Sequence, residues 1–151
     1  MEIGTLCRKN VITVREHDEL IAAAEIMRTR HVGYLVVTRP GTADVAPEPA
    51  GVLTDRDIVI KVVAMQADPR TLTVGDVMTR QPVVVSETES VNKALGEMRR
   101  VGVRRLPVVG VRGQLVGVLS IDDIVEMLAD GLNAVAGSIR NEQRIEGALR
   151  Q

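Results

Sequence analysis

Aromatic side chains are nearly absent from the sequence, which has no tryptophan, no phenylalanine and one tyrosine, Tyr34. Proteins that bind single-stranded nucleic acid stack the bases on such side chains, so their scarcity argues against this class of function. Hydrophobic residues nevertheless make up 45% of the chain. The core must therefore be built from aliphatic side chains.

An excess of charge is also absent, because 19 Lys and Arg against 20 Asp and Glu give a formal net charge of −1. Such a balance provides no long-range attraction to nucleic acid or to an acidic membrane surface. No apolar run approaches the ~20 residues that cross a bilayer, and residues 1–4 lack the basic-then-apolar pattern of a signal peptide. We expect a cytoplasmic protein that binds neither nucleic acid nor membrane.

Residues for disulfide, metal or catalytic chemistry are few. Cys7 is the single cysteine, which excludes an internal disulfide and favours a reducing compartment. His17 and His31 stand apart from other metal-ligating residues, so we expect no metal site. The sequence contains no Ser–His–Asp set and no Walker phosphate-binding motif. These absences predict that the protein is not an enzyme.

One short stretch occurs twice, at residues 51–59 and 117–125. Each copy has a glycine, two apolar residues, a hydroxyl residue and then, three positions on, an aspartate: Thr54 with Asp57, and Ser120 with Asp123. The pattern is typical of a buried strand that leads directly into a helix. A helix start presents unpaired N–H groups and the positive end of the helix dipole, which favour an anion such as phosphate. We therefore predict two ligand-binding junctions.

The duplication extends further, because residues 3–37 align on residues 74–108 without a gap. A β-rich segment, 11–14 or 82–85, is followed in each copy by apolar residues at helical spacing. These are Leu20, Ala23, Ala24 and Met27 in the first copy, and Val91, Ala94, Leu95 and Met98 in the second. An acidic residue before each helix, Asp18 or Glu89, suits a helix start.

Each repeat thus reads as strand–helix–strand–strand–helix, which predicts an α/β fold of the α+β type. The second strands are expected at 32–37 and 103–108, the loops at 38–50 and 109–116, and the last helices at 55–65 and 121–129. We assign residues 1–68 to the first repeat and 69–130 to the second. Because one repeat buries little apolar area alone, we expect the two to share one core.

Residues 131–151 have no counterpart after the first repeat. Apolar residues recur there among polar ones, without proline: Leu132, Val135, Ile139, Ile145 and Leu149. We predict a helical tail, interrupted at Gly137 and Ser138. Two roles remain open for it, packing on its own domain or contact with another subunit.

Three segments, residues 51–57 (GVLTDRD), 74–79 (VGDVMT) and 106–109 (LPVV), resemble the signature segments of CBS domains, named after cystathionine β-synthase. The resemblance covers residues 3–130 and is to the stand-alone bacterial type. It implies a compact pair of β-α-β-β-α repeats that forms a homodimer and binds an adenosine nucleotide (AMP, ADP or ATP) in clefts between the repeats. It also implies a regulatory, energy-sensing role exerted on a protein partner in trans, with no cofactor required.

The resemblance assigns ligand contacts to Thr54, Asp57, Ser120 and Asp123, with each aspartate on the ribose hydroxyls and each hydroxyl residue near the phosphates. A carboxylate can accept hydrogen bonds from two vicinal hydroxyls, as in dinucleotide-binding folds. Other candidates are the backbone of Thr13, Val14, Val84 and Val85 for the adenine edge, Arg56, Arg104 and Arg105 for the phosphates, and Tyr34 for base stacking. Any Mg²⁺ would arrive with the phosphates.

A structural interpretation of the same motifs stays open. Thr54 with Asp57, and Ser120 with Asp123, also match a capping box, in which the two side chains satisfy the helix's own N–H groups. In that case the protein would be a dimeric interaction scaffold with degenerate clefts. Tyr34 aligns with Arg105, so the two clefts are not expected to bind with equal affinity.

Overall fold

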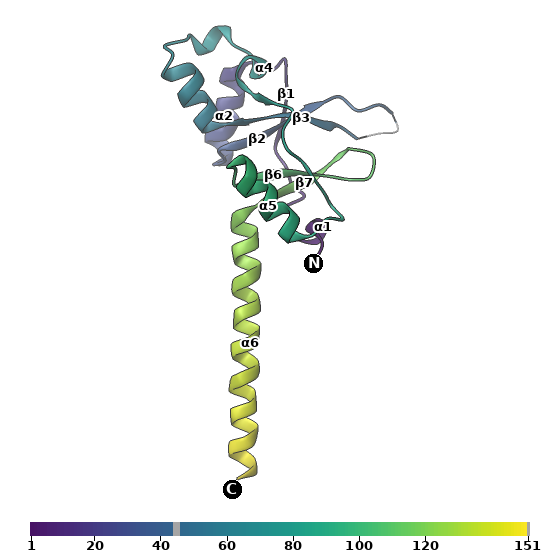
Figure 1. The fold of residues 1–151 in the computed structure, drawn as a ribbon. Helices are drawn as coiled ribbons and strands as arrows, with labels where there is room; N and C mark the ends of the chain where they lie inside the picture. The colour runs from purple at the N-terminus through teal and green to yellow at the C-terminus, as the bar shows by residue number, and fades with distance from the viewer. Residues whose placement is uncertain (44–45, 151) are drawn as a thin grey trace.

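The computed structural model describes residues 1–43 and 46–150, which form two small sheets with helices packed on them and one long helix that projects outward (Figure 1). The first sheet has the strand order β1-β2-β3-β4, and the second β5-β6-β7. The strands are β1 Thr13–Arg15, β2 Tyr34–Arg39, β3 Glu48–Thr54, β4 Thr79–Arg80, β5 Val85–Ser86, β6 Arg105–Val109 and β7 Leu115–Ser120. The α-helices are α1 Ile3–Leu6, α2 Leu20–Arg30, α3 Asp55–Ile58, α4 Val74–Val77, α5 Val91–Val101 and α6 Ile121–Leu149. These elements confirm the α/β tandem repeat.

The two repeats share one topology. β1 runs parallel to β2, and β5 parallel to β6, while β3 and β7 pair antiparallel to β2 and β6. Parallel neighbours need a crossover connection, which α2 and α5 supply. Both hairpins have a register shift at the same place, after Val37 and after Val108. The loop expected at 38–50 is shorter than predicted, because β2 and β3 extend into it; residues 44 and 45 of that loop lie outside the described residues.

The repeats exchange their N-terminal segments. In the first sheet, β4 pairs with β3 through Thr79 and Val52, although it belongs to the second repeat. In the second sheet, Arg8 of the first repeat bridges Val118 in the same antiparallel manner. The short helices that precede these residues are exchanged as well, so α4 packs on the first sheet and α1 on the second. Each sheet is therefore completed by a segment of the other repeat.

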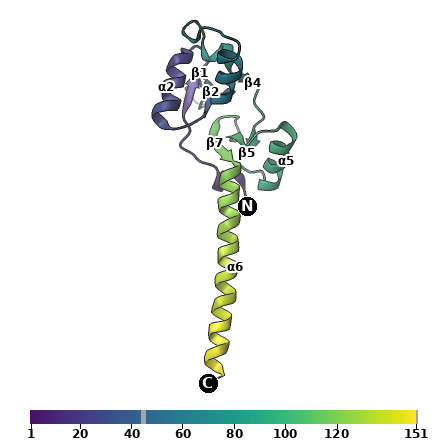
Figure 2. The ribbon, with the colours of Figure 1, turned by 90° about the vertical axis from the view of Figure 1, so that its left-hand side faces the viewer.

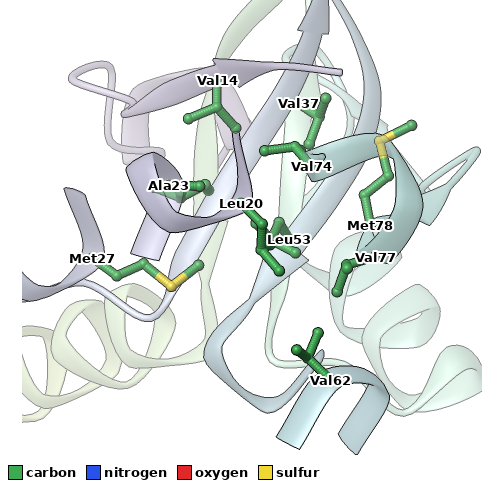
Figure 3. Close-up of a cluster of buried hydrophobic side chains, with 11 residues drawn as sticks. Val14, Leu20, Ala23, Met27, Val37, Leu53, Val62, Val74, Val77 and Met78 are labelled. Carbon is green, nitrogen blue, oxygen red and sulfur yellow. The ribbon is translucent and has the colours of Figure 1, made fainter. Parts of the chain in front are cut away.

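The expectation of one shared core is wrong, because the buried hydrophobic residues form two separate clusters. The first cluster joins the first sheet to α2 and α4 and includes Leu20, Leu53 and Val74 (Figure 3). The second joins the second sheet to α1 and α5 and includes Ile3 and Leu119. The exchanged helices supply the apolar cover that one repeat lacks alone, so each sheet closes its own core.

The acidic residues before α2 and α5 do not cap these helices, contrary to expectation. The carboxylate of Asp18 accepts from the backbone N of Arg15 at 2.7 Å, and that of Glu89 accepts from the backbone N of Ser86 at 2.8 Å. Each carboxylate therefore closes the turn between strand and helix. The cap of α5 is Ser90, whose Oγ accepts from a backbone N–H one turn into the helix.

The helix expected at 55–65 consists of α3 and a π-helical segment, Val59–Val63. Between the repeats, the Pro69–Thr71 segment is a short 3-10 helix. From the second repeat into the tail, α6 runs without a break through Gly137 and Ser138, so the interruption expected there is absent. Ser138 Oγ donates to the carbonyl of Ala134 at 3.1 Å, which satisfies the hydroxyl within the helix.

Within the described part of the chain, the helices are all too short or too polar to cross a bilayer.

Candidate functional site

Two clefts lie between the repeats, and each contains one of the duplicated junctions. The first cleft, of about 600 Å³, contains Thr54 and Asp57 and receives Arg104 and Arg105 from the second repeat. The second cleft, of about 390 Å³, contains Ser120 and Asp123 and receives residues from the first repeat. Both volumes lie in the range of small-molecule sites. The fold thus brings residues distant in sequence to two related cavities.

At the first cleft, β3 leads directly into α3, as the sequence predicted. Thr54 Oγ1 accepts from the backbone N of Asp57 at 3.0 Å, and Asp57 Oδ2 accepts from the backbone N of Thr54 at 3.1 Å. This is a complete capping box. The other oxygen of Asp57, Oδ1, lies 3.1 Å from Lys61 Nζ.

At the second cleft, Ser120 and Asp123 form the same box at the start of α6. Asp123 Oδ2 accepts from the backbone N of Ser120 at 2.9 Å and from its Oγ at 2.5 Å. Asp123 Oδ1 accepts from Arg8 Nε at 2.7 Å. Because Arg8 comes from the first repeat, this ion pair ties the two repeats together across the second cleft.

The surroundings of Asp123 change its acidity. Burial, the largest influence, raises the pKa of this carboxyl, but the hydrogen bonds from Ser120 and Arg8 together lower it below its ordinary value. The same contact raises the pKa of Arg8. Asp123 is therefore held as a carboxylate that already has a cation on its free oxygen.

Tyr34 and Arg105 line both clefts. They occupy aligned positions, at the first residues of β2 and β6, and the Arg105 guanidinium carbon lies 5.8 Å from the centroid of the Tyr34 ring. Burial raises the pKa of the Tyr34 hydroxyl, partly offset by the Arg105 charge. The two side chains separate the two clefts, and the Arg105 guanidinium already covers one face of the Tyr34 ring.

The first cleft is the better suited to phosphate. Its charged lining consists of Arg56, Arg104 and Arg105 against Asp55 and Asp57, and Arg104 also forms an ion pair with Asp122 at 3.0 Å. In the second cleft, Arg8 and Arg105 face Asp122 and Asp123, so these charges balance. Arginine favours forked contacts with phosphate oxygens.

The first cleft also has a distinctly apolar wall. Its apolar lining residues are Val52, Pro82, Val83, Val101, Val103, Leu106 and Pro107. A flat apolar ring system can lie against such side chains while polar groups at one end fix its orientation. The cleft therefore combines an apolar end with a cationic one.

Four residues expected at the adenine edge do not line either cleft: Thr13, Val14, Val84 and Val85. Val14 and Val85 point into the two cores instead. The residues just before the strands line the clefts, with Val11 and Ile12 in the second and Pro82 and Val83 in the first. Two backbone groups of this segment already have partners, because Val36 N donates to the carbonyl of Ile12 at 3.3 Å and Val11 N donates to the carbonyl of Lys9 at 3.0 Å.

Sequence reasoning missed Asn10 and Gln81, which line the second and first clefts. They occupy aligned positions in the two repeats, so the alignment already contained a repeated amide. It also missed Arg8, whose aligned residue is Thr79 in the first cleft. A cation in one copy and a hydroxyl in the other is the signal that the clefts differ.

Metal-ligating residues are dispersed in the structure. Among residues 1–43 and 46–150, no group of three or more His, Cys, Asp or Glu side chains is placed to hold a metal ion. Cys7 is buried in the second core, where its Sγ lies 3.8 Å from the carbonyl of Gly4. It packs there as a small hydrophobic residue.

Comparison with known protein families and sequences gives a consistent result. A family model described as CBS domain matches residues 3–64 and again 74–130. Hypoxic response protein 1 of Mycobacterium tuberculosis is 38% identical over 130 residues, which cover 86% of this chain and 82% of that protein. An uncharacterised protein of Methanopyrus kandleri is 32% identical over 127 residues, 84% of this chain. The chain spans only 62% of the length of that relative.

Solved structures share the fold. The crystal structure of hypoxic response protein I with two coordinated zinc ions is 34% identical with a TM-score of 0.71, covering 84% of this chain and 98% of that chain. A hexameric CBS-CP12 protein from bloom-forming cyanobacteria is 28% identical, with a TM-score of 0.69 and coverage of 83% and 69%. The CBS domain pair of protein MJ0100, in complex with 5′-methylthioadenosine and S-adenosyl-L-methionine, has a TM-score of 0.73 over 87% and 98% of the two chains. At 21% identity, this last likeness shows the fold alone.

Proposed function

The chain belongs to the CBS domain family, and on that premise we propose that it is a regulatory module that binds an adenosine nucleotide in the first cleft. The observation that carries the proposal is the composition of this cleft. It joins the Thr54 and Asp57 junction of one repeat to an apolar wall and two arginines of the other. Proteins of this family that lack an enzyme domain are generally regulatory rather than catalytic.

The geometry of the first cleft supports a role for each of these residues. Asp57 uses Oδ2 for the helix cap, while Oδ1 faces Lys61; each carboxylate oxygen has a second lone pair, which leaves acceptor capacity for ribose hydroxyls. Thr54 Oγ1 accepts from the backbone N of Asp57 and keeps its own proton to donate to a ligand oxygen. Arg56, Arg104 and Arg105 would neutralise the phosphates, and the apolar wall would cover the adenine.

The proposed ligand class is AMP, ADP or ATP, with Mg²⁺ arriving on the phosphates of the longer nucleotides. The MJ0100 pair, which has the same fold, was crystallised with two ligands that contain adenosine but no phosphate. The three arginines that line the first cleft favour a phosphorylated adenosine in this chain. No further cofactor is required.

Signalling would follow from the position of the cleft between the repeats. A ligand that contacts both repeats stabilises one relative orientation of them, which shifts the population of the two orientations. We propose a cytoplasmic homodimer whose orientation is read by a protein partner in trans. Its two sensing repeats would be residues 1–68 and 69–130, and its tail would be residues 131–151.

A second candidate function is supported by one specific observation. Both aspartates complete capping boxes, and both have a cation on the remaining oxygen. A protein with clefts satisfied in this way would be a nucleotide-independent interaction scaffold. The two functions differ in whether a nucleotide changes the stability of the folded chain.

Thermal unfolding of the purified protein with AMP, ADP, ATP and S-adenosylmethionine, each with and without Mg²⁺, tests the proposal. A ligand at 100 times its dissociation constant stabilises the fold by about 2.7 kcal/mol, which corresponds to a rise in Tm of about 5–10 °C. We expect this rise for at least one nucleotide and a clearly smaller rise in Asp57→Asn at the same ligand concentration. Asparagine preserves the acceptor for the helix cap, so its own Tm serves as the control. No rise for any ligand would favour the scaffold.

A further inference from the structure

The helix α6 extends far beyond the domain that it leaves (Figures 1 and 2). Its 29 residues span about 43 Å at 1.5 Å per residue, and its buried residues, Asp123 and Ile124, lie in the first turn. From Leu128 to Arg150 the side chains are exposed, except for the half-exposed Ala136 and Gly137. Helices in water take most of their stability from packing of one face. The described residues offer this part of α6 no such packing.

The exposed part of α6 has an apolar stripe. Val125, Leu128, Leu132, Val135 and Ile139 follow one another at alternating spacings of three and four residues, and Leu149 falls on the same continuation. Leu132 is 72% exposed and Leu149 81%. This spacing is the heptad pattern by which two helices pack side by side. A single narrow stripe of this kind fits a two-stranded pair.

We propose that α6 pairs with α6 of a second copy of this chain, and that the two helices run antiparallel. The proposal rests on the homodimer proposed above and specifies its interface. Leu132 and Val135 occupy the two core positions of one heptad. Further along α6, the position equivalent to Val135 is Glu142, and the position equivalent to Leu132 is Glu146. The direction of pairing therefore decides what these two glutamates face.

The charges along α6 favour the antiparallel direction. Residues 121–130 contain four acidic and no basic residues, residues 131–139 contain no charge, and residues 140–150 contain three Arg and two Glu. A parallel pair would set Glu142 and Glu146 against their own copies and the acidic segment against itself, which is repulsive. In the antiparallel pair the acidic segment lies beside the Arg-containing one. The two helix dipoles also oppose each other.

One antiparallel register places every apolar residue of the stripe against the partner helix. Val125 packs against the partner's Leu149, and Val135 packs against the partner's Ile139. This follows because an antiparallel pair places position a of a heptad in one helix opposite position d of a heptad in the other. Glu142 and Glu146 then lie beside the partner's Leu132 and Leu128. Their methylene groups cover apolar surface there while the carboxylates reach water. Arg150 faces the partner's Asp122 at the rim.

Disulfide cross-linking of the full chain tests the direction. Val125→Cys and Leu149→Cys are made separately, and each is oxidised alone and after co-expression with the other. We expect a cross-linked dimer only in the mixture, because each new thiol faces the other position. The wild-type chain is the control, since Cys7 is buried. Efficient cross-linking of either variant alone would show parallel helices and overturn the proposal.

The mass of the particle in solution tests the interface. Wild-type protein is expected at twice the 16.4 kDa chain mass by light scattering, and Leu132→Glu at the chain mass. Asn133→Glu adds the same charge one position away from the stripe and should remain dimeric. A Leu132→Glu variant that stays dimeric would overturn the α6 interface but not the homodimer. A monomeric wild-type protein would overturn both, whereas nucleotide binding is measured independently.

Discussion

The guanidinium of Arg105 lies over the ring of Tyr34, 5.8 Å from its centroid, and these two residues hold the same position in the two repeats. The first residue of the second strand is thus aromatic in one repeat and cationic in the other, and the two side chains meet where the repeats meet. Because both line both clefts, a ligand in either cleft contacts a residue that the other cleft shares.

Replacing Arg105 by alanine should affect both stability and binding. A cation over a partly exposed ring contributes about 0.5–1 kcal/mol, so the free energy of unfolding in urea should fall by that amount. Nucleotide affinity should fall too, because the first cleft loses a phosphate-facing cation. Arg99→Ala removes an equal charge from α5 outside both clefts and should change neither quantity. Equal effects of the two substitutions would contradict the assigned role.

Arg8→Ala should open the second cleft. The substitution removes the cation from Asp123 Oδ1 and should cost about 1 kcal/mol, a moderate value because the Arg8 side chain is largely exposed. Asp123 then gains acceptor capacity for ribose hydroxyls, but the cleft loses one positive charge, so adenosine rather than a phosphorylated nucleotide should become detectable there by calorimetry. Lys9→Ala is the matched control for the loss of one N-terminal charge. A second cleft that stays empty in Arg8→Ala would show that Arg8 does not restrict it.

Stability should depend on the ionisation of Asp123 in acid. The pKa of Asp123 is lower in the folded chain than its ordinary value, so its stabilising contribution is complete above the unfolded pKa of about 3.9 and is lost as the pH falls through the folded pKa. The difference in unfolding free energy between wild type and Asp123→Asn should therefore shrink below about pH 4. Urea unfolding from pH 3 to pH 7 measures it. A difference that is constant over this range would contradict the shift.

The exchange of N-terminal segments makes Ile3 a core residue of the other repeat. Its side chain is fully buried beside Leu119 and Val85, so Ile3→Ala should destabilise the fold by about 2–5 kcal/mol. Thr5→Ala, in the same helix but on its exposed side, should have a much smaller effect. Denaturant unfolding distinguishes the two. A cost near zero for Ile3→Ala would mean that α1 does not belong to this core.

Local patterns were enough to predict the repeats and their junctions. The strand that ends at Thr54 and the helix that starts at Asp55 are encoded by adjacent residues, and so is the box between Ser120 and Asp123. The exchange of α1 and α4 was not predictable in this way, because it depends on which sheet each short helix covers. Two clusters therefore replaced the expected single core.

Two other expectations differ from the structure for simple physical reasons. The residues expected at the adenine edge do not line the clefts, because β-forming residues such as Val14 and Val85 pack in the cores, while the residues before them line the clefts. The break at Gly137 was expected from the low helix propensity of glycine. Helix-forming neighbours carry α6 through it, and antiparallel pairing would stabilise it further.

Isothermal titration of the nucleotide that raises Tm most, into wild type, Asp57→Asn and Asp123→Asn, tests whether the first cleft binds the nucleotide. We predict one site per wild-type chain and an affinity about 10- to 100-fold weaker in Asp57→Asn, because a hydrogen bond to a charged group contributes about 1.5–3 kcal/mol. Asp123→Asn should bind as wild type does, since Asp123 lines the second cleft and not the first. Unchanged affinity in Asp57→Asn would contradict the assignment of the first cleft as the nucleotide site.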